Sequence, residues 1–339
     1  MTIESVKCSR LRLAACFFAW MALLLPSALV AQSDASRHDL FEVESATALD
    51  REGVPPWHLQ MSFDLSGLNG KEKESGTIEE WWIGQGRKRI VVSSPSFSIP
   101  SMSPKGEDPW VGREAYLVKL LLQQVVHPVQ DYSRFQGLRF ETKPRAFGKV
   151  TLSCISVRSK GMFDSFGWPE YCSEPNTSTL RIHFDAGELS VARNRLGTFM
   201  NTSVSLRNTI SYGGKMAIAG EVTKLERYVP GKDEIAADDS ANGGQEVPGS
   251  VVAGDRVKFV QPEYPEMERA RHAGGSVVLC AVISREGKIT SLDVVASPAE
   301  DFSKSAMEAV RKWEYQPYLL NGKPTELDTT ITINFSTNR

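Results

Sequence analysis

The residues of this chain that could do chemistry are scattered and form no catalytic pattern. Its five histidines are His38, His58, His127, His183 and His272. They form no H-E-x-x-H motif and no pair at the spacing that places two metal ligands on one face of a helix. Glu79 and Glu80 are adjacent in a strand-like segment, so their side chains point to opposite faces and cannot act together as an acid and a base. The sequence also contains no G-x-S-x-G motif and no phosphate-binding loop. It therefore predicts a protein that is not an enzyme and has neither a metal site nor a cofactor.

Length and charge exclude further classes of protein. With 339 residues the chain is longer than one average domain of about 100–200 residues, so we expect two domains, each with its own core. The formal net charge is −2, which creates no basic field that would attract nucleic acid. The sequence therefore predicts a globular protein of two domains that does not bind nucleic acid.

The first 31 residues differ in composition from the rest of the chain. Three basic residues precede an uncharged apolar segment over residues 13–30, and Leu29-Val30-Ala31 ends in a small residue of the kind that signal peptidase requires. This pattern predicts a signal peptide over residues 1–31, cleaved before Gln32, and export to the periplasm. The alternative is an uncleaved inner-membrane anchor, because about 18 apolar residues approach the length that spans a bilayer. Pro26 and the small residue at the end of the segment favour cleavage.

The cysteines agree with an oxidising compartment. Outside the leader the chain has Cys154 in a strand-like segment, Cys172 in the loop that follows, and Cys280 in an apolar segment. In an exported protein we expect Cys154 and Cys172 to form a disulfide, the alternative being two unpaired thiols. Two cysteines alone cannot hold a zinc ion. Cys280 is expected to be a buried and unreactive thiol.

Residues 37–229 alternate mostly between apolar and polar types. In WHLQMSFDL, residues 57–65, five apolar residues alternate with polar ones, which predicts a half-buried antiparallel strand. Many similar segments follow, separated by Gly, Asn and Pro, and together they predict a curved sheet or incomplete barrel. Residues 113–126 carry leucines at helical spacing and are apolar on nearly all sides, so we expect a helix enclosed by the sheet.

A curved sheet that holds a helix, in an exported protein, resembles the fold of the LolA-like lipoprotein carriers. The resemblance is one of pattern and covers only this middle domain, so no binding residue is transferred from the family. It implies that Trp57, Met61 and Phe63, on the concave face, could accept the acyl chain of a lipid. The alternative is that these residues fill the core, as the inward face of any sheet requires.

A change of composition separates this domain from the last one. Residues 230–257 are rich in Gly, Ala and acidic residues and predict a flexible linker. Residues 258–339 predict the order helix, strand, strand, helix, strand, so the whole chain is expected to be of the α+β class. The first two strands flank a hairpin loop in which Gly287 supplies a left-handed conformation. The last strand, TTITINF, alternates in character and has polar Thr and Asn residues on its outward face.

Five short motifs of this last domain resemble, in their order and spacing, the C-terminal domain of the TonB energy-transducer family. They are Gln261-Pro262-Glu263-Tyr264-Pro265, the hairpin at Gly287, Ser297-Pro298, the run AMEAVRKWEYQP, and Gly322-Lys323-Pro324. None is specific alone, but together they extend over the whole domain. The aromatic residues that end the run are interpreted as structural, because they form the corner between the last helix and the last strand.

The TonB resemblance implies protein binding. TonB proteins grip a short extended peptide of an outer-membrane TonB-dependent transporter by adding it as a strand to their sheet, and they pass on energy from inner-membrane motor proteins. By similarity, Gln261 and Tyr264 would lie beside the incoming peptide. Thr330, Thr332 and Asn334 on the outward face of the last strand suit main-chain pairing of this kind. For Tyr264 the alternative is a structural role in the segment that leads into the first helix.

Two features of this chain depart from the TonB family. The leader lacks the histidine with which the family's membrane anchor contacts the motor, and the linker lacks long proline-rich tracts, so about 25 flexible residues span only about 30 Å. Two functions remain open. One is a module that binds outer-membrane transporters in energy-coupled transport. The other is a periplasmic carrier of lipid or another apolar ligand, for which the TonB-like domain is a docking unit.

Overall fold

The computed structural model describes most of the two predicted domains. It describes residues 32–68, 72–84, 87–100, 110, 112–130, 132, 138–159, 169–175, 177, 179–184, 189–231, 256–317, 319–320, 323–324 and 326–336. The predicted leader and most of the predicted linker lie outside these residues. No helix of the described residues is both long enough and apolar enough to cross a membrane.

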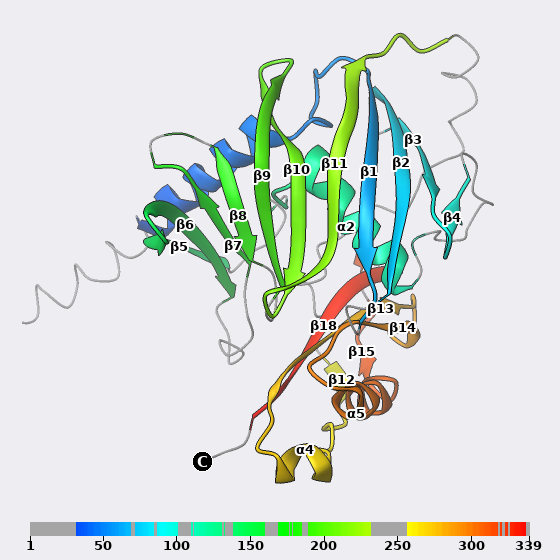
Figure 1. Cartoon of the computed structure of the whole chain (residues 1–339). Helices are drawn as coiled ribbons and strands as arrows, with labels where there is room; N and C mark the ends of the chain where they lie inside the picture. The colour runs from blue at the N-terminus through cyan, green and yellow to red at the C-terminus, as the bar shows by residue number, and fades with distance from the viewer. Residues whose placement is uncertain are drawn as a thin grey trace, which may run out of the picture.

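The larger domain is an antiparallel sheet of eleven strands (Figure 1). The strands are β1 (Trp57–Ser66), β2 (Lys73–Gly84), β3 (Arg87–Ser93), β4 (Ser98–Ile99), β5 (Leu138–Phe147), β6 (Val150–Ser159), β7 (Glu170–Ser173), β8 (Leu180–Phe184), β9 (Leu189–Phe199), β10 (Thr202–Tyr212) and β11 (Lys215–Arg227). Their order across the sheet is β4-β3-β2-β1-β11-β10-β9-β8-β7-β6-β5. Because β1 pairs with β11, the beginning and the end of the domain meet in the middle of the sheet. The prediction of an antiparallel curved sheet is confirmed.

Two helices lie against one face of this sheet, behind it in the view of Figure 1. Residues 32–47 are helical and cover β5, where the backbone N–H of Phe140 donates to Oγ of Ser33 at 3.1 Å. This helix was not predicted. The second helix, α2 (Arg113–Val126), lies on β10 and β11, as expected for residues that are apolar on nearly all sides. It comes so close that a Cβ atom at Gly220 would lie 2.5 Å from Cδ2 of Leu121.

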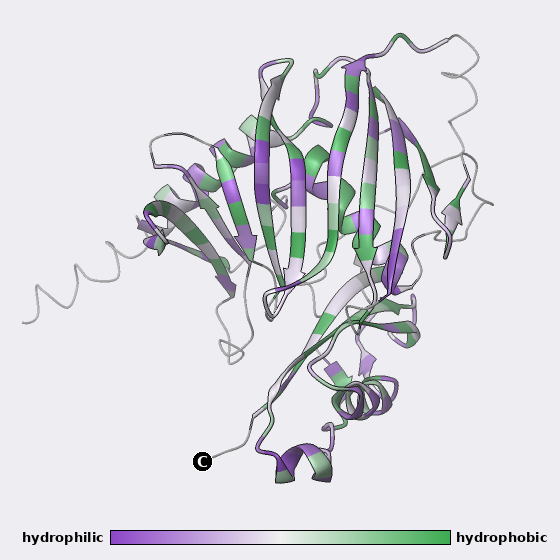
Figure 2. Ribbon diagram, in the orientation of Figure 1, coloured by the Kyte–Doolittle hydropathy of each residue, from purple (hydrophilic) through white to green (hydrophobic). Residues whose placement is uncertain are grey.

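The alternating pattern of the sequence decides which side chains this face buries. Figure 2 shows hydrophilic and hydrophobic residues alternating along the strands. Trp57, Met61 and Phe63 of β1 are all 2% exposed or less, and they share one apolar cluster with α2. These three residues therefore lie in the apolar core of the larger domain, and a role of theirs in accepting an acyl chain stays a prediction.

Hydrogen bonds of His127 connect the ends of the two helices that lie on the large sheet. Nδ1 of His127, just after α2, lies 2.6 Å from Oδ1 of Asp50, and Nε2 lies 3.6 Å from Oε1 of Glu44. Burial alone would lower the pKa of His127, but its hydrogen bonds to the two carboxylates raise the pKa to about 10. His127 is therefore charged at neutral pH and holds the helix over residues 32–47 to the end of α2.

The C-terminal domain has the predicted order of elements. Its helices are α4 (Glu266–Ala270) and α5 (Glu300–Val310), and its strands are β12 (Arg256–Lys258), β13 (Gly275–Ile283), β14 (Ile289–Ala296), β15 (Glu314–Tyr315), β16 (Leu319–Leu320), β17 (Lys323–Pro324) and β18 (Leu327–Phe335). β14, β13 and β18 form an antiparallel sheet in that order. Helix α5 packs on one face of it and buries Phe302, Ala306 and Val310 against the sheet.

Trp313 and Tyr315, which follow α5, form hydrogen bonds with two other segments of the domain. The indole N–H of Trp313 donates to the carbonyl of Val260 at 2.7 Å, and the backbone N–H of Tyr315 donates to the carbonyl of Gly287 at 2.8 Å. Gly287 has a φ of 82°, and a Cβ atom there would lie 1.8 Å from the carbonyl oxygen of Tyr315. The hairpin turn therefore needs glycine both for its backbone conformation and for this close approach.

We predict that Gly287→Ala lowers the free energy of unfolding by about 3 kcal/mol, because a left-handed alanine is strained and its Cβ atom would displace Tyr315. Gly53→Ala is the matched control, since Gly53 has a φ of 83° but no atom within 4 Å of the added Cβ. It should cost only about 1 kcal/mol. Urea unfolding of the full chain measures both variants. Equal losses would show that the contact with Tyr315 has no energetic importance.

We also predict that stability depends on pH through His127. The folded pKa of His127 is about 10 and exceeds the ordinary histidine pKa of 6.5, so the stabilisation is complete below pH 6.5 and is lost as the pH rises to about 10. After allowance for partial exposure the loss should be on the order of 1 kcal/mol. His127→Gln should flatten urea-unfolding profiles over this range, whereas substitution of the exposed His38 should leave them unchanged. Superimposable profiles for the wild type and His127→Gln would contradict the assignment.

Candidate peptide-binding edge of the C-terminal domain

β18 is the last strand of the three-stranded sheet and has a neighbour on one side only. It pairs with β13 along its whole length, from Leu327 opposite Ile283 to Phe335 opposite Gly275. Among the described residues no strand pairs with the other edge of β18. A terminal strand of this kind presents main-chain N–H and C=O groups on which another extended segment can pair.

The two faces of β18 have different surroundings. Ile331, Ile333 and Phe335 are buried in the core beneath α5. On the opposite face, the hydroxyl groups of Thr330 and Tyr116, a residue of α2, lie 2.9 Å apart. Thr332, on the same face, is only 8% exposed. This face of β18 is therefore directed toward the larger domain.

This arrangement corrects the expectation of a polar strand with an outward face. Of the three polar residues expected on the outward face, only Asn334 is exposed, and its Oδ1 accepts a hydrogen bond from Oγ of Ser276 at 2.5 Å. Thr330 contacts α2, and the hydroxyl of Thr332 is buried with no hydrogen-bond partner in the part of the chain that the structure describes. Alternation alone cannot show that a second domain covers a strand face. The free edge of the strand is a separate feature and is retained.

An apolar contact fixes the C-terminal sheet to the larger domain. Val278, Cys280, Val295 and Ala296 belong to the same apolar cluster as α2 and β1. Cys280 is buried and takes part in no disulfide, as expected. The face of the three-stranded sheet opposite α5 is therefore covered by the larger domain rather than by solvent.

A buried arginine strengthens the same interface. Nε of Arg113, at the start of α2, donates to the carbonyl of Val295 in β14 at 3.1 Å, and Nη2 donates to the carbonyl of Ser66 in β1 at 2.8 Å. The guanidinium group thus satisfies two main-chain oxygens from the two domains. Removal of the group would leave both oxygens without this donor at a buried position.

The two residues expected beside an incoming peptide differ in their surroundings. Gln261 is exposed. Tyr264 is half-buried, its hydroxyl donates to the carbonyl of Ala273, and its ring makes edge-on contacts with Phe302 and Phe335, with ring centres 5.5 and 5.7 Å away. Tyr264 therefore attaches the segment before α4 to the end of β18, which is the structural role that the sequence left open. Contact of either residue with a peptide stays a prediction.

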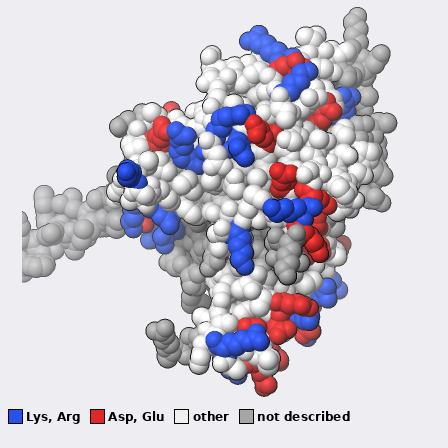
Figure 3. Space-filling model, in the orientation of Figure 1, with Lys and Arg blue, Asp and Glu red and all other residues white. Residues whose placement is uncertain are grey.

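The segment before α4 carries exposed apolar residues that the sequence analysis did not single out. Val257 is 66% exposed and Phe259 is 54% exposed. The guanidinium group of Arg256 lies 4.7 Å from the ring centre of Phe259 and 4.8 Å from that of Trp313. Charges of both signs are mixed over the face of the molecule that Figure 3 shows.

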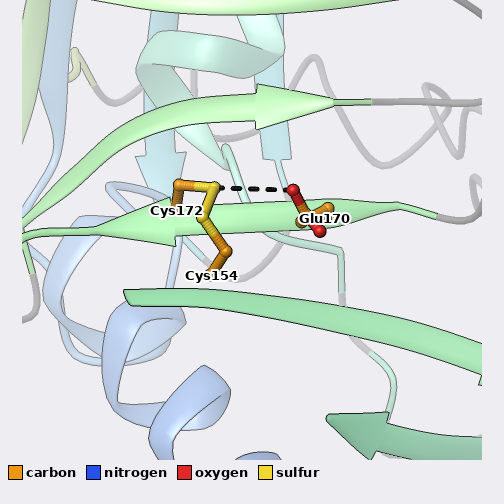
Figure 4. A group of neighbouring side chains, drawn as sticks. All are labelled: Cys154, Glu170 and Cys172. Carbon is orange, nitrogen blue, oxygen red and sulfur yellow. Dashed lines mark hydrogen bonds between the residues drawn. A yellow bond between two sulfur atoms is a disulfide. The ribbon is translucent and has the colours of Figure 1, made fainter. Parts of the chain in front are cut away.

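The remaining candidate site groups are structural. Figure 4 shows Cys154, Cys172 and Glu170, whose ligand atoms lie within 4.8 Å of one another. The two sulfur atoms form a disulfide with an S–S distance of 2.06 Å, across neighbouring strands β6 and β7, and are therefore not thiolate ligands. A disulfide sulfur carries no proton, so its approach to Glu170 at 3.8 Å is a contact rather than a hydrogen bond.

Glu79 and Glu80 lie on opposite faces of β2. Glu79 accepts a hydrogen bond from Gln60 at 2.9 Å and lies 2.7 Å from Nε2 of His58, whereas Glu80 is 1% exposed. The expectation that the two carboxylates are separated by the strand is met. His58 lies between Glu79 and Glu226 and stacks on Trp81, an arrangement that orders the surface of the sheet.

The larger domain has a cavity of about 250 Å³ at one end of its core. It is lined by Gly197, Thr198, Phe199, Val204, Leu206, Val222, Thr223, Lys224 and Leu225 of strands β9, β10 and β11. Several of these residues pack in or against the apolar cluster that contains α2. Its lining therefore differs from the buried face formed by Trp57, Met61 and Phe63.

A three-stranded antiparallel sheet with one helix-covered face, whose last strand is paired on one side only among the described residues, defines a module that can accept a further strand. Residues 260–337 match the family described as "Gram-negative bacterial TonB protein C-terminal". Protein TonB of Vibrio cholerae is 31% identical over 77 residues, which are 22% of this chain and 32% of that protein. The chain thus spans about a third of the length of this curated relative.

Solved structures resemble the two domains separately. The TonB C-terminal domain of Pseudomonas aeruginosa has 27% sequence identity and a TM-score of 0.23, covering 25% of this chain and 86% of that one. A LolA superfamily protein from Nitrosomonas europaea has 4% identity and a TM-score of 0.35, covering 57% of this chain and 96% of that one.

We predict that Arg113→Met weakens the contact between the two domains. Loss of its two hydrogen bonds to buried carbonyl groups should lower the free energy of unfolding by about 2–3 kcal/mol. Hydrogen exchange should become faster in α2 and β14. Glu114→Gln is the control, because Glu114 touches the same guanidinium group at 3.3 Å from an exposed position. Unchanged exchange in Arg113→Met would show that the apolar contact alone holds the domains together.

Proposed function

We propose that this chain binds an extended segment of an outer-membrane TonB-dependent transporter, which adds as a strand to the free edge of β18. The observation that carries the proposal is the terminal position of β18 in a module whose residues 260–337 match the TonB C-terminal family. Such binding would connect the chain to energy-coupled transport across the cell envelope, from the periplasmic side.

The surroundings of β18 suggest where a peptide would pair. The hydroxyl of Thr330 lies against Tyr116 of α2, whereas Asn334 near the end of the strand is exposed. An incoming segment therefore meets the larger domain near the first half of β18 and solvent near the second half. We expect the main-chain ladder to form mainly along residues 332–336, beside the segment that carries Gln261.

Paired substitutions at one position of β18 test strand addition. Thr332→Pro removes an N–H group, whereas Thr332→Val keeps it and removes only a hydroxyl that bonds to none of the described residues. If the N–H group of residue 332 lies on the free edge, Thr332→Pro should remain folded and bind peptide about tenfold more weakly. Thr332→Val should bind as the wild type does. Circular dichroism and calorimetric titration with transporter-derived peptides measure folding and affinity.

The neighbouring residue supplies the complementary outcome. Successive residues of a strand direct their N–H groups to opposite edges. If Thr332→Pro unfolds the sheet, the N–H group on the free edge is therefore that of Ile333. Ile333→Pro is then the variant that should remain folded and bind peptide more weakly. A folded wild type that binds no transporter-derived peptide at millimolar concentration would refute strand addition at β18.

A separate prediction concerns Gln261. Replacement by Ala should weaken peptide binding by about 1 kcal/mol if its amide group bonds the peptide, with no change in stability because the side chain is exposed. Glu263→Ala, an exposed substitution in the same segment, is the control. An unchanged affinity for Gln261→Ala would remove this residue from the proposed site.

The cavity of about 250 Å³ favours a second candidate function, the binding of lipid or another apolar ligand by the larger domain. Mass spectrometry of organic extracts from protein purified out of native envelopes tests it. Val204→Trp, which places a large side chain at the cavity, should remove any ligand that is found, while Val150→Trp, at an exposed position of β6, should retain it. Absence of a co-purifying apolar molecule from the wild type would leave this function without support.

A further inference from the structure

Four polar side chains are buried together between the helices and the large sheet. Arg193 of β9 and Asn208 of β10 are direct partners in the ladder, and His183 of β8 lies opposite Val191, two residues from Arg193. Gln124 of α2 is the hydrogen-bond partner of Arg193. Their exposed fractions are 5% for Arg193, 0% for Asn208, 5% for His183 and 3% for Gln124. The surroundings are two apolar clusters, one containing Val191 and Ile210 and the other containing Tyr171 and Leu180.

Most of the hydrogen-bonding capacity of this group is unused. Nη2 of Arg193 donates to Oε1 of Gln124 at 2.7 Å. Nη1 of Arg193, both ring nitrogens of His183, and both amide atoms of Asn208 are buried without a hydrogen-bond partner among the described residues. Polar atoms buried within proteins are nearly always paired, with the protein, with water or with a bound group. Unpaired atoms from three neighbouring strands therefore indicate an outside partner.

The charges of the group specify what that partner must be. Burial lowers the pKa of Arg193 to about 9, which leaves the guanidinium group charged at neutral pH. Burial and the charge of Arg193 lower the pKa of His183 to about 3, so its imidazole is neutral. The remaining titratable neighbour is Tyr171, which stacks on His183 and whose hydroxyl lies 2.9 Å from that of Tyr132. The described residues form no ion pair between Arg193 and a carboxylate.

A buried cation that lacks a counter-charge is costly, because several kcal/mol of hydration are lost without an opposite charge to replace them. A guanidinium group offers planar, paired donors that match the oxygens of a carboxylate or phosphate. The neutral imidazole supplies one more N–H donor and the amide of Asn208 supplies two. Together these groups have the charge and the donors that suit an oxyanion.

We propose that Arg193, His183 and Asn208 form a binding site for a carboxylate or phosphate group in the larger domain. The oxyanion can be a small free anion or the head of a molecule whose apolar part lies among the flanking apolar clusters. The site is separate from the edge of β18, so it does not depend on peptide binding.

Calorimetric titration of the full chain at neutral pH tests the proposal with four compounds: sodium acetate, inorganic phosphate, sodium decanoate and uncharged decanol. We expect at least one of the three anions to bind at millimolar concentration or below, and decanol to bind more weakly than decanoate. Binding of acetate or phosphate would identify a free anion as sufficient, whereas binding of decanoate alone would identify the head group of an amphiphile.

Variants locate the site. Arg193→Met, which replaces the buried charge by an apolar side chain of similar length, should remain folded and lose affinity by about tenfold or more. Asn208→Leu provides a second variant should the first fail to fold. The control is Arg195→Met, two residues along the same strand, where an exposed arginine pairs with Glu221 at 2.8 Å. It should bind as the wild type does.

Two results would overturn the proposal. One is the absence of binding of every anion by folded wild-type protein. The other is equal anion affinity in the wild type and a folded Arg193→Met or Asn208→Leu variant. A Thr332→Pro variant that loses peptide binding but still binds the anion would show that anion binding is independent of peptide binding at β18.

Discussion

The burial of α2 from two sides is the constraint on which the rest of this structure depends. One side of the helix lies on β10 and β11 of the large sheet, and another meets β14 of the C-terminal sheet, so ten of its fourteen residues are buried. A helix in contact with only one sheet needs only one apolar stripe, whereas α2 is apolar on nearly all sides. Arg113 adds a polar contact at its start, with hydrogen bonds to both domains. Helix α2 therefore belongs to the cores of both domains. The packing that completes the core of the larger domain also fixes the position of the C-terminal domain.

The pairing of β1 with β11 makes this shared core possible. It brings residues that are far apart in the chain into one ladder, from Trp57 opposite Arg227 to Leu65 opposite Ile218. At the ends of β1 the chain is held by Trp57, whose indole N–H donates to the carbonyl of Leu49 at 3.0 Å, and by the bond from Arg113 to Ser66. Long-range pairing of this kind costs loop-closure entropy, which the large apolar cluster between the sheet and α2 offsets.

Local patterns predicted the elements well because each depends on neighbours in the chain. The alternation of residues 57–65 predicted β1, the leucine spacing of residues 113–126 predicted α2, and the glycine of the C-terminal hairpin has the expected left-handed conformation. The surroundings of the candidate site could not be predicted in the same way. Thr332 has the type of a solvent-facing strand residue, but the larger domain buries it. Similarly, Arg193 and His183 occupy positions in the sequence that look like ordinary polar positions of a strand. They are buried only because helices cover this face of the sheet.

The fixed position of the C-terminal domain also limits how a peptide can reach β18. In an isolated module the whole free edge would be open to an incoming strand, with both of its ends unrestricted. Here the contact of Thr330 with Tyr116 places α2 beside the first half of the strand, and the sheet face behind it is filled by Val278 and Ala296. A partner that adds to β18 as proposed would therefore have to be extended and narrow near the larger domain, and it could widen only beyond Asn334. Because the core does not have to rearrange for a strand to add, affinity would come mainly from the main-chain ladder, and selectivity would come from the space that α2 leaves.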